Sequence, residues 1–325
     1  MRIFVTGGTG YIGRALVRRL VAEGHQVRAL VRATSRAEGL AELGVSLFTG
    51  DVLDRPSMRE GMSGADWVIH AAADLDLNGP PARMRAANVE GSANVASLAY
   101  KLGVGRFLSI SSIAFFGGSP EGGAAGNEET PPRLPFPSLY SETKHAGEMA
   151  IREWAKRGLR LNTVYPSLVY GPPGKKEGAN SILRSLAKGR YPVLVAARRR
   201  TSWIYLDDVV EALSRVIARA APGRDYLLAG DAASFRELAD RVAALAGVRA
   251  PRLDLPVAAA RLVVAAAGPY YRLRGRRPPF TSAQLGSLTR DWAFDDRRAR
   301  EELDWHPRTL AEGLPPAIEF LLAGS

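Results

Sequence analysis

The first half of the chain alternates short apolar runs with stretches of helical periodicity, and one further apolar run follows in the second half. The helical stretches are Ile12–Glu23, Ala82–Leu102 and Ser138–Arg157, and a glycine follows each where a left-handed cap is wanted. The apolar runs predict strands at Ile3–Val5, Gln26–Val31, Val45–Thr49, Trp67–Ala71, Arg106–Ser111, Leu161–Tyr165 and Tyr226–Ala229. This alternation predicts an α/β fold with a parallel sheet and helices on both faces.

The rest of the chain is less regular. The pattern predicts helices at Asn180–Lys188, Asp207–Ala220 and Leu310–Ala323, and it is helical from Ser234 onward. Residues Gly117 to Pro137 are rich in Gly, Pro and Glu, which predicts a long loop over the strand ends, where such sheets bind ligands.

The stretch Pro256–Tyr271 is strongly apolar, although Arg261 and Gly268-Pro269 interrupt it. It is shorter than the roughly 20 residues that a membrane span needs. We interpret it as a buried helix that lines a substrate pocket. A helix that touches a membrane surface is the alternative left open.

Composition excludes several kinds of site. With 325 residues, 46% hydrophobic and 24% charged, the chain suits one large globular domain or two intimate ones. It has no cysteine, which removes disulfides, thiolate metal sites and cysteine nucleophiles, and its four histidines show no metal spacing, so we predict no metal site. No signal peptide precedes the first strand, so we expect a cytoplasmic location.

The net charge of +11 comes mostly from arginine. The positive charge is scattered, with short clusters at Arg198–Arg200 and Arg272–Arg277. Neither aromatic–basic alternation nor a recognition motif accompanies these clusters, and a basic balance alone supports only non-specific attraction. We therefore predict no nucleic-acid partner.

A glycine-rich turn connects the first predicted strand to the first predicted helix. Residues Thr6 to Gly13 read T-G-G-T-G-Y-I-G, with glycines spaced G-x-x-G-x-x-G at Gly7, Gly10 and Gly13. Such glycines let backbone approach a ligand without a Cβ in the way, and the helix N-terminus favours negative charge. The strand, turn and helix in this order predict a site for a dinucleotide pyrophosphate.

The end of the second strand bears on which dinucleotide binds. It ends at Val31, 18 residues after Gly13, where an NAD site usually places Asp or Glu for the ribose 2′-hydroxyl. This chain has Arg32, with Arg36 close behind, and guanidinium groups pair with a 2′-phosphate. We therefore predict NADP(H), with NAD(H) as the alternative. Asp51, after the third strand, either accepts from the adenine amino group or caps the following turn.

A tyrosine and a lysine share one face of the predicted helix Ser138–Arg157. Tyr140 and Lys144 are four residues apart, and a neighbouring ammonium brings the pKa of a phenol toward the working range. Ser109, Ser111 and Ser112 lie at the end of the fifth strand, where any of the three could donate to a carbonyl oxygen that Tyr140 protonates.

Together these residues resemble the extended short-chain dehydrogenase/reductases, also called the NAD-dependent epimerase/dehydratase family. The likeness covers essentially the whole chain, and it includes His70–Ala73, Asn88–Gly91, Pro166–Pro172 (PSLVYGP), Trp203–Asp208 (WIYLDD) and Ala299–Pro307 (AREELDWHP). The resemblance implies a Rossmann doubly wound parallel sheet with a smaller, mostly helical C-terminal substrate domain. The expected division is 1–172 plus 201–230 for the dinucleotide and 173–200 plus 231–325 for the substrate.

The resemblance also implies roles for single residues. Tyr140 would be the acid–base, Lys144 the ribose anchor and pKa tuner, and Ser112 the catalytic serine, while Asn88 would position Lys144 directly or through water. The residues expected to bind the cofactor are Gly7, Gly10, Tyr11, Ile12 and Gly13 at the pyrophosphate, Arg32 and Arg36 at the 2′-phosphate, Asp51 and Val52 at adenine, Ala71, Ala72 and Ala73 at the ribose, and Pro166, Leu168 and Val169 beside the nicotinamide.

Three features indicate which branch of the family the chain resembles. Dehydratases carry Thr-Asp-Glu where this chain has Ser112-Ile113-Ala114, and epimerases usually place a diphosphate-binding arginine where it has Thr201, although Arg200 is adjacent. The substrate side is apolar instead. The residues expected to contact substrate are Asp74, Ile113, Phe115, Ser167, Asn180 and Trp203, with Phe116, Leu139 and Leu168 nearby. The chain looks most like the dihydroflavonol reductase and 3β-hydroxysteroid dehydrogenase branch.

The sequence therefore predicts an NADP(H)-dependent oxidoreductase that interconverts a hydroxyl and a ketone or aldehyde on a fairly apolar small molecule. An NAD-dependent nucleotide-sugar epimerase is the first alternative, and a non-catalytic dinucleotide-binding sensor or assembly factor is the second. The resemblance also suggests a homodimer formed by the helices Ala82–Leu102 and Ser138–Arg157.

Overall fold

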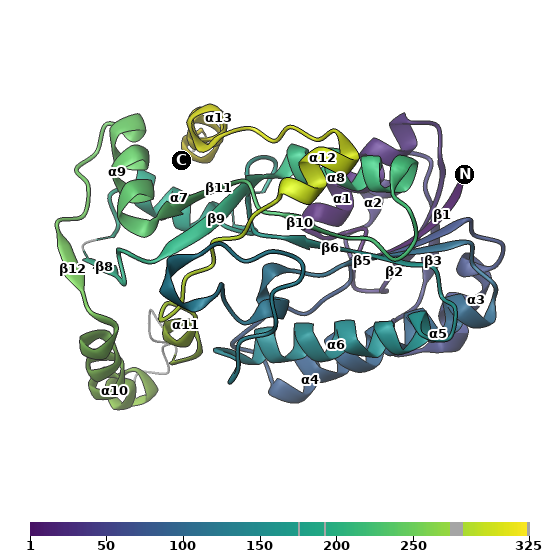
Figure 1. Ribbon diagram of the computed structural model, residues 1–325, viewed down its shortest axis with the longest axis horizontal. Helices are drawn as coiled ribbons and strands as arrows, with labels where there is room; N and C mark the ends of the chain where they lie inside the picture. Colours follow the sequence, from purple (N-terminus) through teal and green to yellow (C-terminus); the bar gives the residue numbers. More distant parts are fainter. Residues whose placement is uncertain (175, 192, 274–281, 324–325) are drawn as a thin grey trace.

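A seven-stranded parallel sheet forms the centre of the larger part of the molecule (Figure 1). The computed structural model describes residues 1–323 except 175, 192 and 274–281. The strand order is β10-β6-β5-β4-β1-β2-β3, so the chain runs outward from β1 to β3 and then returns to the other side at β4. The strands are β1 (Arg2–Thr6), β2 (Gln26–Val31), β3 (Ser46–Thr49), β4 (Trp67–His70), β5 (Arg106–Ile110), β6 (Leu161–Pro166) and β10 (Asp225–Leu228). Each strand predicted from an apolar run is present, and its ends lie within one residue of those predicted.

The apolar runs form strands because both faces of the sheet are covered by helices. In β1, Ile3 and Val5 point into one apolar layer and Phe4 into the other, and all three are fully buried. The first layer lies under α1 (Tyr11–Ala22), α2 (Glu38–Ala41), α8 (Leu206–Arg219) and α12 (Arg297–Leu303), and the second under α3 (Arg55–Met62), α5 (Gly91–Lys101) and α6 (Leu139–Ala155). The Rossmann fold is confirmed, and its switch point lies between β1 and β4.

The predicted helix Ala82–Leu102 is not uniform. It consists of α4 (Pro81–Arg85), a π-helical turn η1 (Ala86–Glu90) and α5. α6 passes very close to this turn, since a Cβ on Gly147 would lie 2.0 Å from the Asn88 carbonyl oxygen. A π-helical turn is a local insertion in an otherwise continuous helix, so the helical prediction covered this turn without distinguishing it.

The C-terminal part contains two small sheets that the sequence did not predict. β7 (Leu168–Tyr170), β9 (Arg200–Tyr205) and β11 (Asp231–Ser234) form one, and β8 (Val193–Val195) pairs with β12 (Leu253–Leu255) in the other. The helices α7 (Asn180–Ala187), α9 (Phe235–Ala246) and α13 (Leu310–Leu322) share a core with the first of these sheets. β12 shows that the region after Ser234 is not helical throughout.

The apolar stretch Pro256–Tyr271 lies in α10 (Val257–Leu273), which is followed by α11 (Ser282–Ser287). One face of α10 packs on Leu285, but Leu262 and Val263 on the other face are 73% and 58% exposed. The prediction of a buried helix is therefore wrong for this outer face, because no described element covers it. Among the described residues, no helix is long and apolar enough to cross a membrane. Residues 274–277 of the predicted basic cluster lie outside the described residues.

Candidate active site

The glycine turn after β1 closes on itself and on the segment after β4. Gly7 has φ +74°, and a Cβ on it would lie 2.5 Å from the Ala72 nitrogen. A Cβ on Gly13 would lie 2.1 Å from the Gly7 carbonyl oxygen. Gly10 precedes the first turn of α1, and no side chain caps this helix N-terminus. The residues present therefore fit a dinucleotide, because the cradle is bare backbone and the helix N–H groups face it.

Basic side chains gather at the carboxyl end of β2, beside this turn. Arg32 and Arg36 are exposed immediately after the strand. Arg14, in the first turn of α1, donates from Nη2 to the Arg36 carbonyl oxygen at 3.2 Å. Arg14 was not predicted as a binding residue, although its place directly after Gly13 of the glycine turn could have indicated it. This end of the sheet can hold a phosphate group on the adenosine ribose.

Asp51 caps the turn after β3. Its Oδ1 accepts from the Leu53 N–H at 2.9 Å, so the capping alternative is the one that the structure shows. Val52 packs against α5, where a Cβ on Gly91 would lie 2.7 Å from Val52 Cγ2. The adenine contacts predicted for both residues stay predictions.

Tyr140, Lys144 and Ser112 meet at the carboxyl end of β5. Ser138 caps α6 by accepting from the Ser141 N–H at 3.2 Å, which sets the start of the helix that carries Tyr140 and Lys144. The Tyr140 hydroxyl is hydrogen-bonded to Ser112, and Lys144 Nζ donates to the Ile110 carbonyl oxygen at 3.3 Å. α6 thus brings a phenol, a hydroxyl and an ammonium to one strand end.

Of the three candidate serines, Ser112 is the one that contacts the tyrosine. Its Oγ already accepts from the Ala114 N–H at 3.2 Å, at the start of the short helix η2 (Ile113–Phe116), so its own proton is free to donate. Ser109 instead donates to Glu148 at 2.8 Å, and the buried Ser111 Oγ has no hydrogen-bond partner among the described residues.

Burial is the largest influence on the pKa values of Tyr140 and Lys144. It raises the pKa of Tyr140, and the hydrogen bond from Ser112 opposes that rise. Burial also lowers the pKa of Lys144 to about 8, and the charge of Glu148 opposes that fall. Desolvation and the Ser112 contact act on the Tyr140 pKa in the protein without cofactor, and desolvation is the larger of the two. The lowering expected from Lys144 stays a prediction.

Glu148 is a buried carboxylate one helical turn beyond Lys144, and the sequence reasoning did not single it out. It is 3% exposed and accepts from Ser109 at 2.8 Å and from Thr163 at 2.7 Å. Arg152 Nε lies 3.2 Å from it. Lys144 and Glu148 thus fasten α6 to adjacent residues of β5. Its place four residues after Lys144, on the same face of the helix, could have indicated Glu148 from the sequence.

Two polar residues near the site hold the structure together. Asn88 donates from Nδ2 to the Asp74 carbonyl oxygen at 3.0 Å and to Thr143 Oγ1 at 3.1 Å, so it bonds to the neighbour of Lys144. His70 lies between Thr6 and Ser92 at 2.8 and 3.0 Å, and burial together with Lys144 lowers its pKa to about 3. This histidine is neutral at physiological pH.

Several residues predicted to contact substrate are packed in apolar clusters. Trp203 lies on β9 and is 4% exposed within the core that α7, α9 and α13 share. Ile113 and Phe115 pack in another apolar cluster, where the Phe115 ring stacks on His145 at 4.7 Å between centroids. An apolar side chain after a strand is as suited to a core as to a ligand, so their substrate contacts stay predictions.

Four polar residues predicted at the site also bond within the fold. Asn180 is fully buried and bonds to Gly171, Gly174 and Tyr11, so its amide is not aimed at a substrate. Tyr11, predicted at the pyrophosphate, donates its hydroxyl to the Gly171 carbonyl oxygen. Ser167 donates to the Ala229 carbonyl oxygen at 2.6 Å, and Asp74 is 2.7 Å from Arg83.

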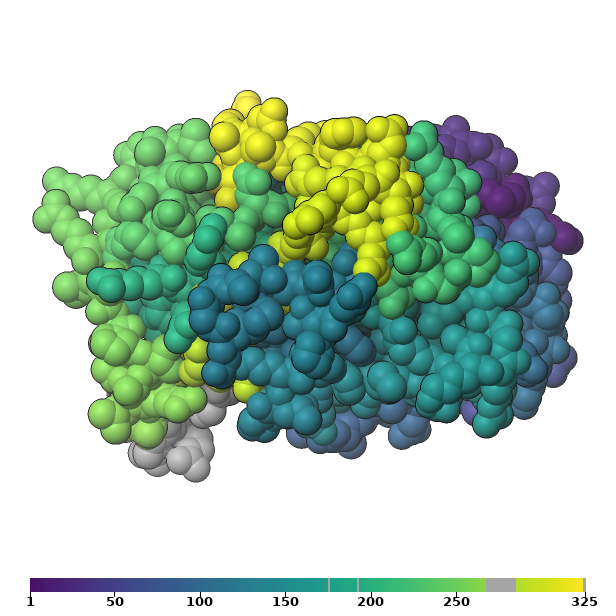
Figure 2. Space-filling view, viewed as in Figure 1, coloured from purple at the N-terminus to yellow at the C-terminus, as the bar shows by residue number. Residues whose placement is uncertain are grey.

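The loop from Gly117 to Pro137, which includes a short helix η3 (Glu121–Gly123), is held by a segment near the C-terminus. Arg290 donates to the carbonyl oxygens of Gly117, Arg133 and Pro135 at 2.6 to 2.7 Å. Gly126 bonds with Ala293 and Asp295 through backbone groups, and Trp292 bonds with Arg200 of β9. The segment 290–295 therefore connects the 117–137 loop to the three-stranded sheet, and Figure 2 shows the loop on the front face.

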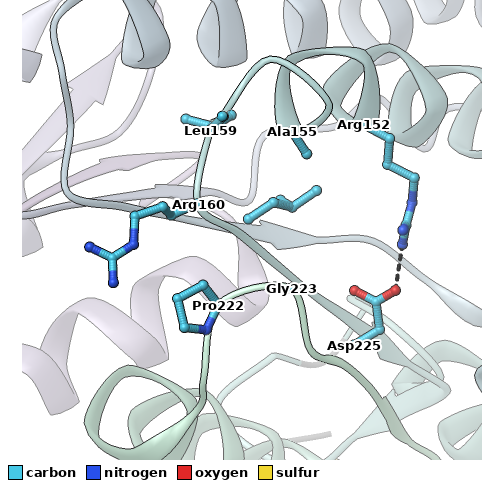
Figure 3. A pocket seen from close by; sticks show the side chains of 9 residues that line it. Arg152, Ala155, Leu159, Arg160, Pro222, Gly223 and Asp225 are labelled. Carbon is cyan, nitrogen blue, oxygen red and sulfur yellow. Dashed lines mark hydrogen bonds and ion pairs between the residues drawn. The ribbon is translucent and has the colours of Figure 1, made fainter.

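A hollow of about 340 Å³ lies at the amino ends of the strands, away from the carboxyl ends where the candidate active site lies (Figure 3). Its lining includes Leu161 and Asp225, which stand at the amino ends of β6 and β10, and Arg152 pairs with Asp225 across it at 2.7 Å. Ligands bind such sheets at the carboxyl ends. This hollow is therefore not part of the candidate site.

Comparisons with known proteins agree with this geometry. Residues 3–229 match the model of the NAD dependent epimerase/dehydratase family. The chain is 29% identical to a 2-alkyl-3-oxoalkanoate reductase of Stenotrophomonas maltophilia, over 97% of each chain. It is also 29% identical to a 3 beta-hydroxysteroid dehydrogenase/Delta 5-->4-isomerase of Mycobacterium tuberculosis, over 97% of this chain and 90% of that one. The crystal structure of gox2253 superposes with a TM-score of 0.84 at 29% identity, covering 98% of this chain and 97% of that one.

Proposed function

Because the chain belongs to the NAD dependent epimerase/dehydratase family, we propose that it is an NADP(H)-dependent oxidoreductase acting on an apolar ketone, aldehyde or hydroxyl compound. That it is an NAD(P)-dependent oxidoreductase follows from the family and from its reductase and dehydrogenase relatives. The observation that carries the proposal is the meeting of Tyr140, Ser112 and Lys144 beside the glycine turn.

Each of the three side chains has a distinct task. When substrate binds, Ser112 donates to the substrate oxygen the proton that it otherwise donates to Tyr140, and it orients this oxygen toward Tyr140. In reduction, Tyr140 gives its proton to that oxygen, and in oxidation it takes the proton back. The Lys144 ammonium stabilises the resulting phenolate and holds the cofactor ribose. The bound cofactor would supply or accept the hydride, and its oxidised, positively charged form would favour the phenolate.

The apolar substrate class rests on similarity and on what the site lacks. The relatives named above are a reductase and a steroid dehydrogenase. Asn180 is held by hydrogen bonds within the fold, so its amide is not free for the diphosphate of a sugar nucleotide. Arg200 is exposed and uses Nη2 to reach the Ala232 carbonyl oxygen at 3.0 Å, which leaves its other donors available. The Asn180 contacts argue against the epimerase alternative.

The test of the proposed function is a paired measurement on the purified protein. NADPH and NADH affinities are measured by fluorescence titration, and NADPH oxidation is followed with a panel of apolar ketones and aldehydes. We expect tighter binding of NADPH and turnover with at least one carbonyl compound. Tight retention of NAD would favour the epimerase instead, and NADPH binding without turnover on any carbonyl would favour a sensor or assembly factor.

The first prediction concerns cofactor preference. Arg32→Ala should weaken NADPH binding about 10- to 100-fold and leave NADH binding unchanged, because it removes one charge-assisted contact to the 2′-phosphate. Arg18→Ala is the matched control, since Arg18 is an exposed arginine further along α1. An equal loss of affinity for both dinucleotides in Arg32→Ala would contradict the assignment.

The second prediction concerns pH. Reduction needs Lys144 charged, so activity falls as pH rises through its pKa of about 8. The charge of Glu148 raises that pKa. In Glu148→Gln the alkaline limb of kcat/KM should therefore move about half a unit to one unit lower. Glu142→Gln removes an exposed carboxylate from the same helix, where it pairs with Arg85, and should leave the limb in place. An unchanged profile in Glu148→Gln would show that this carboxylate does not act on Lys144.

A further inference from the structure

The outer face of α10 is apolar where surface helices are normally polar. Among residues 257–266 the only charged one is Arg261. Val257, Ala260 and Val264 face the cluster around Leu285, while the α10 face, which we define as Leu262, Val263, Ala265 and Ala266, is exposed. A helix that is apolar all round is expected to be covered on every side. An exposed patch of this kind marks a surface that binds something.

The charge around α10 indicates what covers it. Residues 249–266 contain three arginines and one acidic residue, Asp254. Arg236 pairs with that aspartate. Arg249, Arg252 and Arg261 are exposed. An apolar helical face flanked by arginine is the composition of helices that lie in the interface of an anionic bilayer, where the side-chain stems reach into the acyl region and the charges stay at the headgroups.

A second copy of the chain fits this surface less well. A symmetric pair would bring two regions of the same positive charge together, which repel each other. We therefore propose that the α10 face is a docking surface for an anionic lipid bilayer. The helix stands at one end of the molecule (Figure 1), so a planar surface can reach it.

Docking at this face would bring the candidate active site close to the bilayer. α10 packs on α11 through Ala260 and Leu285. α11 in turn approaches the residue before the cap of α6, since a Cβ on Gly286 would lie 2.3 Å from the Pro137 carbonyl oxygen. Two short steps of packing therefore connect the α10 face to the helix that carries Tyr140. That a lipophilic substrate enters from the membrane rests on the proposed function, whereas the docking itself does not.

Flotation with vesicles tests the docking. The full-length protein is mixed with vesicles of phosphatidylcholine and phosphatidylglycerol, or of phosphatidylcholine alone, at low and high salt. We expect it to float with the anionic vesicles and to be released by salt. The double variant Leu262→Asp, Val263→Asp should bind the anionic vesicles at least about tenfold more weakly than the wild type. In the wild type both apolar side chains are transferred from water into the bilayer on docking, and the aspartates lose this gain.

Leu245→Asp is the matched control, since Leu245 is an exposed leucine on α9 in the same part of the chain. It should float as the wild type does, and thermal melting should show that all variants are folded. A wild-type protein that stays in solution, or a double variant that floats as well as wild type, overturns the proposal. If the double substitution instead reduces the oligomer size and the wild type does not float, the face belongs to a second copy. NADPH titration is independent of all these outcomes and reports on the proposed function separately.

Discussion

The Tyr140→Phe variant is expected to lose about 10²- to 10⁴-fold in kcat while binding NADPH as tightly as the wild type. The substitution removes only the hydroxyl that is hydrogen-bonded to Ser112, and the half-buried ring keeps its place on α6. Lys144 keeps its contact with the Ile110 carbonyl oxygen, so the proposed ribose anchor remains. Turnover is measured from NADPH oxidation, and affinity from fluorescence titration of the same preparation.

Tyr100→Phe is the control for this experiment. Tyr100 is an exposed tyrosine on α5 that packs against Trp154, so it loses the same hydroxyl at a place remote from Ser112. Its turnover should match the wild type. If Tyr140→Phe retained turnover, Tyr140 could not be the acid–base. If it lost NADPH binding as well, the effect would be structural.

The second large effect is expected from Gly13→Ala. The added Cβ would lie 2.1 Å from the Gly7 carbonyl oxygen, so the glycine turn must open or α1 must shift. Either movement takes helix N–H groups away from the pyrophosphate, and NADPH affinity should fall at least about a hundredfold. The strain should also lower the free energy of unfolding by about 1–3 kcal/mol. Titration and chemical denaturation measure the two losses separately.

Gly39→Ala offers the same chemical change without the clash. Gly39 lies on α2 with no atom within 4 Å of an added Cβ, so affinity should be unchanged and stability equal or slightly higher. NADPH binding that survived in Gly13→Ala would mean that the pyrophosphate does not rest on this turn.

The main sheet could be predicted from the sequence because its strands are buried on both faces. A run such as Ile3–Val5 must be apolar throughout when alternate residues enter two different cores. β7 and β8 were missed because each has only three residues, and their partners lie far along the chain. Nothing in so short a segment separates a strand from a loop.

The meeting of Tyr140, Lys144 and Ser112 could be predicted, whereas the packing of the residues expected to contact substrate could not, for a related reason. A tyrosine and a lysine four residues apart on a helix lie on the same face, because the helix geometry alone sets their relative position. Asn180 has no such local partner, and its amide could serve a ligand or the backbone of Gly171 equally well. Trp203 and Phe115 could likewise serve a ligand or the apolar core. Only the tertiary packing decides these cases.

The attachment of the 117–137 loop to residues 290–295 has a consequence for the order in which the protein matures on the ribosome. All strands of the main sheet have been synthesised once Leu228 emerges, so that sheet can form early. Arg290, whose guanidinium holds the carbonyl oxygens of Gly117, Arg133 and Pro135, arrives much later. A nascent chain arrested between these two points would have its glycine turn but an unfastened 117–137 loop. This loop is therefore fastened only after residue 290 has been synthesised.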